Sequence, residues 1–252
     1  MPLIAPERCF EPYPVEDMQL PPGIVDENVP EQALRRQNDK IWGMSTEQQR
    51  KTISAYMASV RFMDEQVGRL LKALERLGAR EETIVIFLSD HGYNLGEHKC
   101  WSKVSLWEGS VRVPMIISTP GYEENYGKTN ESIVELIDLY PTLTELCGFS
   151  DNVPEILQGQ SLTPIIRTNT IIRDEAYAYS VTYGGRAGAI RTEKWKYVRW
   201  GDEVKENNEE LYDHHNDPEE HNNLVYEADH VDTLNEMRKI FEEIRKKANQ
   251  KH

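Results

Sequence analysis

The chain is poor in cysteine, in long apolar runs and in basic residues, and each shortage argues against a class of protein. Three cysteines among 252 residues are too few and too scattered for a disulfide framework or a cysteine-rich zinc site. A mean hydropathy of −0.65, without an apolar run of about 18 residues, predicts no membrane-spanning helix. The 29 basic residues face 43 acidic ones, so a net charge of −14 favours neither a nucleic-acid nor a membrane partner.

The first 44 residues show no sustained hydrophobic period and are predicted to form an extended lead-in. Their opening also lacks the basic region and apolar run of a secretory signal. The sequence therefore does not indicate a cellular compartment.

Residues 45–170 alternate between helical and strand patterns, which favours an α/β domain. Ser45 and Gln48 have the spacing of a capping box, and an apolar stripe recurs every three or four residues until Gly78. The run Thr83–Leu88 is apolar throughout, so we expect a strand buried on both faces at the centre of a parallel sheet. Further strands are predicted over 111–118 and 131–137, followed by a helix from Asp138 that ends at Gly148.

Residues 171–252 change character and are predicted to form a smaller α+β subdomain. Short runs over 176–181, 187–191 and 194–200 favour an antiparallel meander with one face in solvent. A charged helix with one apolar stripe is predicted from Val231 to Lys247.

Asp90 and His91 follow the predicted buried strand directly, and this position is the best candidate for a functional site. Ligands of open α/β sheets bind outside the carboxyl ends of strands. A carboxylate and an imidazole together offer a metal one hard oxygen and one nitrogen ligand. Twelve residues after His91, Lys103 offers a compact charge suited to a tetrahedral oxyanion. On these residues alone, an Asp-His pair that only caps a helix or holds a loop is an equally good interpretation.

Two other groups of residues have structural interpretations that we prefer. His214, His215 and His221 lie among aspartates, but Asp-Pro at 217–218 is typical of a turn. Glu108 and Arg112 are predicted to form a buried ion pair that supports the following strand.

Four stretches of the chain, in order, resemble the sulfatase family of the alkaline phosphatase superfamily, and most closely its iduronate-2-sulfatase-like branch. They are AYMASVRFMDEQVGRLLKALERLG, TIVIFLSDHGYNLGEHKCWSK, SLWEGSVRVPMIISTPG, and ELIDLYPTLTELCG together with ELYDHHNDPEEHNNL. The resemblance implies an alkaline-phosphatase-like sheet with flanking helices, of which this chain carries a part. It also implies a sulfuric ester hydrolase that acts on a sulfated sugar or a small sulfate ester.

The resemblance implies roles for individual residues. Asp90 and His91 match half of a divalent metal site, usually calcium, and Lys103 matches the lysine that contacts the sulfate group. Tyr93 and His98 flank these positions and are candidates for the lining of a substrate pocket.

The chain departs from the family pattern at the nucleophile. The family forms a formylglycine from the first residue of Cys/Ser-x-Pro-Ser-Arg, and none of Cys9, Cys100 and Cys147 begins such a motif. The paired aspartates that complete the metal site are also missing. We therefore expect the C-terminal portion of a sulfatase, inactive alone, whose partner is a missing N-terminal segment or chain. A phosphonate or phosphodiester hydrolase of the same superfamily, or a non-catalytic remnant, stay open as alternatives.

Overall fold

The computed structural model describes residues 3–36, 43–150, 154, 156–170, 178–182 and 187–249. Three short helical turns, η1 (Glu7–Cys9), η2 (Val15–Asp17) and η3 (Ala33–Arg36), precede the long helix α2 (Thr46–Arg76). The first two lie along α2, where the Ser54 hydroxyl donates a 2.6 Å hydrogen bond to the carbonyl oxygen of Tyr13. The lead-in thus packs on α2.

Helix α2 begins and ends where the sequence predicts. The Ser45 hydroxyl accepts from the Gln48 backbone N–H, and the Gln48 side chain accepts from the Ser45 N–H at 2.8 Å. Gly78, at a φ of +66°, follows the C-cap and turns the chain out of the helix.

The strand after α2 is shorter and less buried than predicted. After η4 (Arg80–Glu82), β1 (Val85–Leu88) pairs antiparallel with β4 (Met115–Ser118), and all four residues of β1 are only half-buried. In the described part of the chain β1 has no strand partner besides β4. The predicted parallel sheet is therefore wrong for these residues, because β1 and its partner β4 run antiparallel.

Two further predictions in this region need correction. Residues 108–111 form the short helix α3 (Glu108–Val111), so the second strand starts only at Met115, after Pro114. Residues 131–135 are irregular, and η7 (Leu136–Asp138) leads into α4 (Leu139–Leu146), which ends before Gly148 as predicted. Asp138 explains why the predicted strand over 131–137 does not form. Its two carboxylate oxygens accept from the Glu135 and Gln160 N–H groups and hold the segment in a turn.

A small loop module lies between β1 and β4. It comprises β2 (Asn94–Leu95), η5 (Glu97–Lys99), β3 (Trp101–Ser102) and α3, with β2 and β3 paired antiparallel. After β4 come η6 (Glu123–Asn125), η7, α4 and α5 (Thr163–Thr168).

The C-terminal region is an antiparallel sheet in the order β5-β6-β7-β8, as the predicted meander requires. Its strands are β5 (Ala178–Thr182), β6 (Ala187–Arg191), β7 (Trp195–Trp200) and the unpredicted β8 (Glu209–Asp213); residues 176 and 177 of the first predicted strand lie outside the described residues. The prediction of one solvated face is wrong, because β8 is buried throughout. One face packs on the apolar stripe of α6 (Val231–Ala248), after the turns η10 (Leu224–Tyr226) and η11 (Ala228–His230). The other face packs on residues that include Val29, Ala33 and Trp107.

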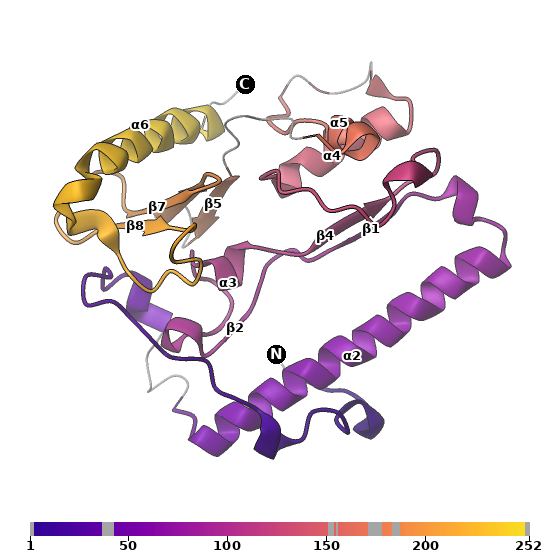
Figure 1. The fold of residues 1–252 in the computed structure, drawn as a ribbon, viewed down its shortest axis with the longest axis horizontal. Helices are drawn as coiled ribbons and strands as arrows, with labels where there is room; N and C mark the ends of the chain where they lie inside the picture. Colours follow the sequence, from indigo (N-terminus) through magenta and orange to yellow (C-terminus); the bar gives the residue numbers. More distant parts are fainter. Residues whose placement is uncertain are drawn as a thin grey trace.

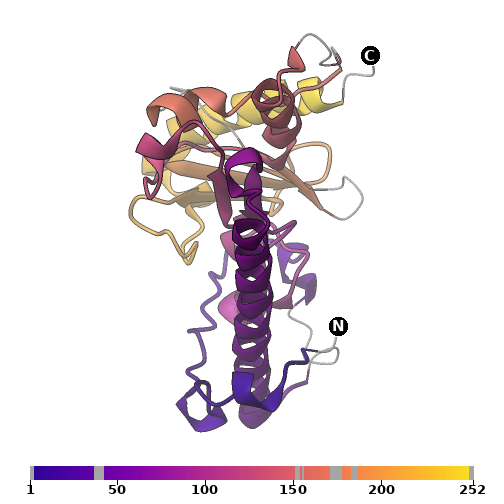
Figure 2. The same cartoon turned by 90° about the vertical axis from the view of Figure 1, so that its right-hand side faces the viewer.

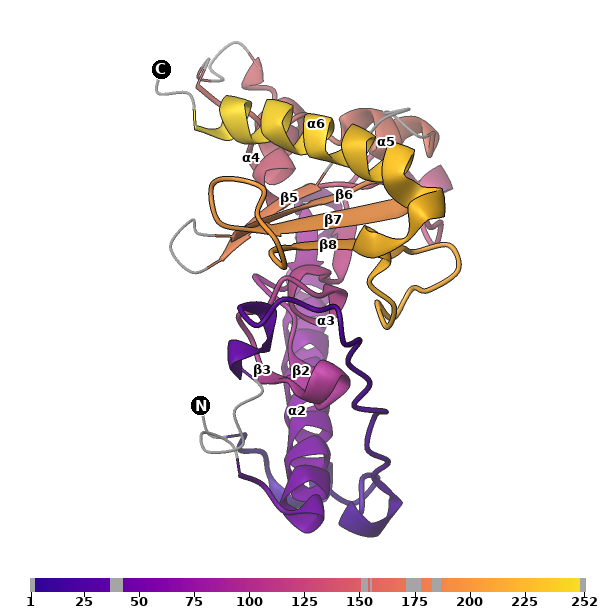
Figure 3. The same cartoon turned by 90° about the vertical axis from the view of Figure 1, so that its left-hand side faces the viewer.

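The molecule is an α/β fold of the alkaline-phosphatase-like type, with small antiparallel sheets and flanking helices (Figure 1). Figures 2 and 3 show α2 extending far from the β5–β8 sheet, which lies beneath α6. Among the described residues, no helix combines the length and apolar character needed to cross a bilayer.

Candidate active site

The structure brings Asp90, His91 and Lys103 together at the end of β1. The Lys103 ammonium lies 2.9 Å from Nε2 of His91, and the Asp90 carboxylate lies 3.5 Å from the same nitrogen. Asp90 and His91 follow β1 directly, whereas Lys103 follows β3, so the antiparallel β2–β3 pair returns the chain to the strand end. The Asp90 side chain is 84% exposed, so the group faces solvent.

Hydrogen bonds determine which nitrogen of His91 is free to act as a ligand. Nδ1 lies 2.9 Å from the backbone carbonyl oxygen of Gly92, and a carbonyl can only accept, so Nδ1 carries the proton. Nε2 then holds a lone pair, which in this structure accepts from the Lys103 ammonium. An imidazole whose second nitrogen donates to a carbonyl is the usual arrangement of a metal-binding histidine.

These donors suit part of a divalent metal site. When the Lys103 ammonium moves off Nε2, a metal that takes nitrogen and oxygen ligands can bind between this nitrogen and the exposed Asp90 carboxylate. Calcium takes six or more oxygen-rich ligands, so Asp90 and His91 fit it only as two members of a larger set.

Gly92 permits the close packing that holds this site. A Cβ atom at Gly92 would meet the carbonyl oxygen of Gly109 at 2.2 Å, a distance that real Cβ atoms do not adopt. The Gly92 N–H donates to the carbonyl oxygen of Ser110 at 2.8 Å. The chain just after His91 is thereby fixed against α3.

Tyr93 and His98, the two predicted substrate-lining residues, lie in different surroundings. The half-buried Tyr93 ring stacks on Tyr56 of α2 with centroids 5.2 Å apart. His98 is only 5% exposed and stacks on Trp107 at 4.3 Å. Burial is the largest cause of a His98 pKa lowered from 6.5 to about 4, and nearby Lys196 lowers it further. His98 is therefore a neutral, packed side chain in this structure.

A buried ionic cluster anchors α3 to the C-terminal sheet. The ammonium of Lys196, 1% exposed, lies 2.5 Å from the Glu220 carboxylate and 3.2 Å from that of Glu108. His214 Nε2 lies 3.0 Å from Glu220. Burial alone would raise the pKa of Glu220, but Lys196 and His214 lower it to about 2. Glu108, His214 and Glu220 have metal-ligand spacing, yet the Lys196 ammonium already pairs with both carboxylates of this cluster.

This cluster corrects the predicted ion pair of Glu108. Glu108 pairs with Lys196 of β7, while Arg112 is exposed. The turn interpretation of 213–221 agrees with the structure: Asp213 accepts from the His215 and Asn216 N–H groups, and Asp217 accepts from those of His221 and Asn222. Sequence reasoning missed Lys196, because a lysine inside a strand pattern gives no sign of its partner.

Comparisons with known proteins identify the family of this chain. The family model described as Sulfatase matches residues 22–149, and the one described as N-sulphoglucosamine sulphohydrolase, C-terminal, matches residues 96–247. The chain belongs to the sulfatase family. A curated relative, the Sulfatase of Formosa agariphila, is 32% identical over 87% of this chain and 43% of its own length. The N-acetylglucosamine-6-O-sulfatase of Bacteroides thetaiotaomicron is 33% identical over 76% of this chain and 35% of its own.

Solved structures are also similar to this chain over less than half of their length. One, in complex with its substrate D-glucosamine-2-N,6-O-disulfate, matches 80% of this chain and 42% of its own at 30% identity and a TM-score of 0.71. The phosphonate monoester hydrolase of Agrobacterium radiobacter matches the same shares at 26% identity and a TM-score of 0.69. The chain thus spans less than half the length of these relatives.

Proposed function

We propose that this chain supplies the C-terminal part of the active domain of a metal-dependent sulfatase, which hydrolyses sulfate esters. The observation that carries the proposal is the convergence of Asp90, His91 and Lys103 in a member of the sulfatase family. Asp90 and His91 would hold one side of a divalent metal, calcium by preference. Lys103 would contact the sulfate group.

Each residue has a distinct task in this proposal. A bound divalent metal supplies a Lewis acid that polarises the sulfate group. Lys103 stabilises negative charge on the sulfate oxygens, because its ammonium is exposed and lies beside the metal ligands. The Gly92 carbonyl holds the His91 ring with Nε2 directed toward Asp90 and Lys103.

The proposed substrate is a sulfated sugar. Among the similar proteins, one is named for N-acetylglucosamine 6-O-sulfate chemistry and one is in complex with a disulfated glucosamine. A net charge of −14 disfavours long sulfated polymers, so a terminal residue or a small ester suits this chain better. The narrower iduronate-2-sulfatase-like specificity remains our prediction.

The site needs a second polypeptide region to be complete. Asp90 and His91 are too few for calcium, and no formylglycine motif is present in the sequence. We propose that the remaining half of a sulfatase domain, joined to this chain or separate, supplies the nucleophile and the other ligands.

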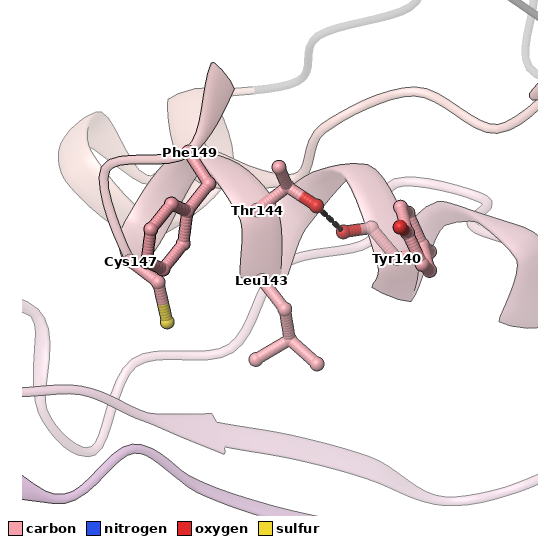
Figure 4. Close-up of a pocket in the computed structure, with 5 residues that line it drawn as sticks. All are labelled: Tyr140, Leu143, Thr144, Cys147 and Phe149. Carbon is pink, nitrogen blue, oxygen red and sulfur yellow. Dashed lines mark hydrogen bonds between the residues drawn. The ribbon is translucent and has the colours of Figure 1, made fainter. Parts of the chain in front are cut away.

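An uncovered apolar face is where this half would dock. Large apolar residues at least 37% exposed follow α2 and continue on β4, η7 and α4: Met57, Val60, Met63, Leu70, Leu77, Ile116, Leu136, Ile137, Tyr140 and Leu143. Figure 1 shows β1 and β4 between α2 on one side and α4 on the other. On α4, an apolar hollow of about 450 Å³ is lined by Tyr140, Leu143, Thr144, Cys147 and Phe149 (Figure 4). Exposed apolar residues that gather in such numbers are typical of an interface.

A second candidate function is phosphonate monoester hydrolysis. The similarity to the Agrobacterium radiobacter enzyme favours it specifically, and the same residues would serve a phosphoryl oxyanion. The alternatives separate in one assay on the protein assembled with its remaining half, given an aryl sulfate and an aryl phosphonate monoester. Our proposal predicts preferential sulfate release that falls at least about 100-fold in Lys103→Gln. Preferential phosphonate hydrolysis would support the second candidate, and no hydrolysis of either ester would support a non-catalytic remnant.

A further inference from the structure

Lys103 lies in a backbone segment that its own residues do not favour. Ser102 and Val104, on either side of it, have φ values of +74° and +77°, and neither is glycine. A β-branched residue such as Val104 in this region is a strained outlier. Something else in the structure must therefore hold these two residues.

Asn94 is the buried side chain that holds the Ser102 end of this segment. It is 2% exposed, and its Nδ2 donates to the Ser102 carbonyl oxygen at 3.3 Å, to Ser105 Oγ at 3.3 Å and to Ser110 Oγ at 2.7 Å. The Ser102 carbonyl belongs to the peptide bond that precedes Lys103. Asn94 thus bonds directly to the backbone that carries the lysine.

The same amide connects the lysine to the histidine. Ser110, which accepts from Asn94 through its hydroxyl, accepts from the Gly92 N–H through its carbonyl. The Gly92 N–H belongs to the peptide bond that follows His91. A continuous path of hydrogen bonds therefore runs from the peptide after His91, through Ser110 and Asn94, to the peptide before Lys103.

The packing around Asn94 shows that its position is specific. A Cβ on Gly109 would meet the Asn94 Oδ1 at 2.3 Å, so only glycine fits there. Within the described part of the chain, this buried Oδ1 has no hydrogen-bond partner. A buried oxygen without a partner destabilises the fold, and an apolar side chain at this position would avoid that cost.

We infer that Asn94 is a positioning residue, which sets the Lys103 ammonium against His91 and toward the sulfate group. The inference rests on the proposed function only for what Lys103 does. The lysine itself touches the substrate, whereas Asn94 acts through the backbone of residues 102–104. Its amide donors, rather than its volume, carry the effect.

Acetylation of lysines in the full chain tests this inference, with the labelling rate of each lysine read by mass spectrometry. Lys72, exposed on α2, is the internal reference. In the wild type the hydrogen bond to His91 should slow Lys103 about fivefold relative to Lys72. Asn94→Asp keeps the volume but removes both donors, and Asn94→Ala removes the group; in both, Lys103 should label as fast as Lys72.

A matched control separates positioning from loss of stability. Asn223 is also a buried amide, 3% exposed, with four hydrogen bonds to backbone groups of the C-terminal region and the lead-in. Asn223→Ala should lower the melting temperature while Lys103 stays protected. Retained protection in Asn94→Asp, or equal loss in Asn223→Ala, would overturn the inference.

Inorganic sulfate in the same assay tests the proposed function separately. If Lys103 contacts sulfate, the anion should slow the labelling of Lys103 further in the wild type. The affinity for sulfate, obtained from this protection, should be about tenfold or more lower in Asn94→Asp. No effect of sulfate on Lys103 would count against the proposed function, while the comparison of Asn94→Asp with Asn223→Ala would still decide the positioning role.

Discussion

At the scale of single residues, buried charge joins the loop module to the C-terminal sheet. The Lys196 ammonium lies between the carboxylates of Glu108 and Glu220 with almost no access to solvent. Buried ions are stable only when they are paired, because removal from water is expensive. The cluster therefore specifies how α3 sits on β7 more than it adds to stability.

Replacing Lys196 by methionine should lower the free energy of unfolding by about 3–5 kcal/mol, because the buried Glu220 carboxylate and the partly buried Glu108 carboxylate lose their counter-ion. Lys194→Met is the matched control: this lysine is 52% exposed, and its pairing with Asp213 should contribute less than about 1 kcal/mol. Urea unfolding monitored by circular dichroism measures both. Equal losses in the two variants would contradict this account of the cluster.

The lowered pKa of His98 makes stability depend on pH. The folded state holds the His98 pKa at about 4, whereas the unfolded chain titrates near 6.5, so between these values the unfolded state binds more protons. The contribution is complete above about pH 6.5 and is lost as the pH falls toward 4, by about 3 kcal/mol in all. Urea unfolding from pH 7 to 4 measures it. His98→Phe keeps the stacking on Trp107 and should flatten the profile; an unchanged slope would refute the assignment.

The sequence predicted which chemically active residues meet, but not what holds them. Asp90 and His91 are adjacent in sequence, and the position after a strand predicts a site without any tertiary detail. Asn94, Lys196 and Glu220 act across distances that no local pattern reports. The small residues of 102–110, Ser102, Ser105, Gly109 and Ser110, were the one available sign of a tightly packed loop.

At the scale of elements, α2 shows how a local signal defines a helix end. Ser45→Ala removes the acceptor for the Gln48 N–H and should lower the free energy of unfolding by about 1 kcal/mol. Ser59→Ala is the control, since the Ser59 hydroxyl only donates to the Ala55 carbonyl within the helix, and alanine favours the helix more. Thermal unfolding should therefore show a lower midpoint for Ser45→Ala alone. The reverse order would exclude capping at Ser45.

Elements whose signals are local were predicted, and those that depend on partners were not. The caps of α2, the stop at Gly148 and the amphipathic α6 follow from neighbouring residues. How far β1 and β8 are buried depends on segments that are distant in sequence. Residues 131–137 do not form a strand, because the Asp138 carboxylate accepts from the Gln160 N–H and holds the segment in a turn. The hydrophobic period of a segment carries no information about such long-range contacts.

At the scale of the whole molecule, the uncovered face from α2 to α4 should promote association. When the chain is purified alone at micromolar concentration, light scattering should detect dimers or larger species. Exposed apolar residues, and the edge of β1 that has no strand partner among the described residues, favour association. The double variant Val60→Glu, Leu70→Glu should shift it toward monomer. Val231→Glu, an equally drastic change at the start of α6, should not. A wild-type chain that stays a monodisperse monomer would contradict the docking face.

Calorimetric titration with calcium of this chain assembled with its remaining half tests the proposed metal site most directly, because Asp90 and His91 alone are too few ligands for calcium. Asp64→Asn, an exposed site on α2, is the control for nonspecific attraction of calcium to an acidic protein. One saturable site with a Kd below about 1 mM is expected in the assembled wild type and in assembled Asp64→Asn, and its loss is expected in assembled Asp90→Asn. Equal heats in all three proteins would show that Asp90 and His91 do not hold a metal, and the proposed sulfatase half-site would have to be abandoned.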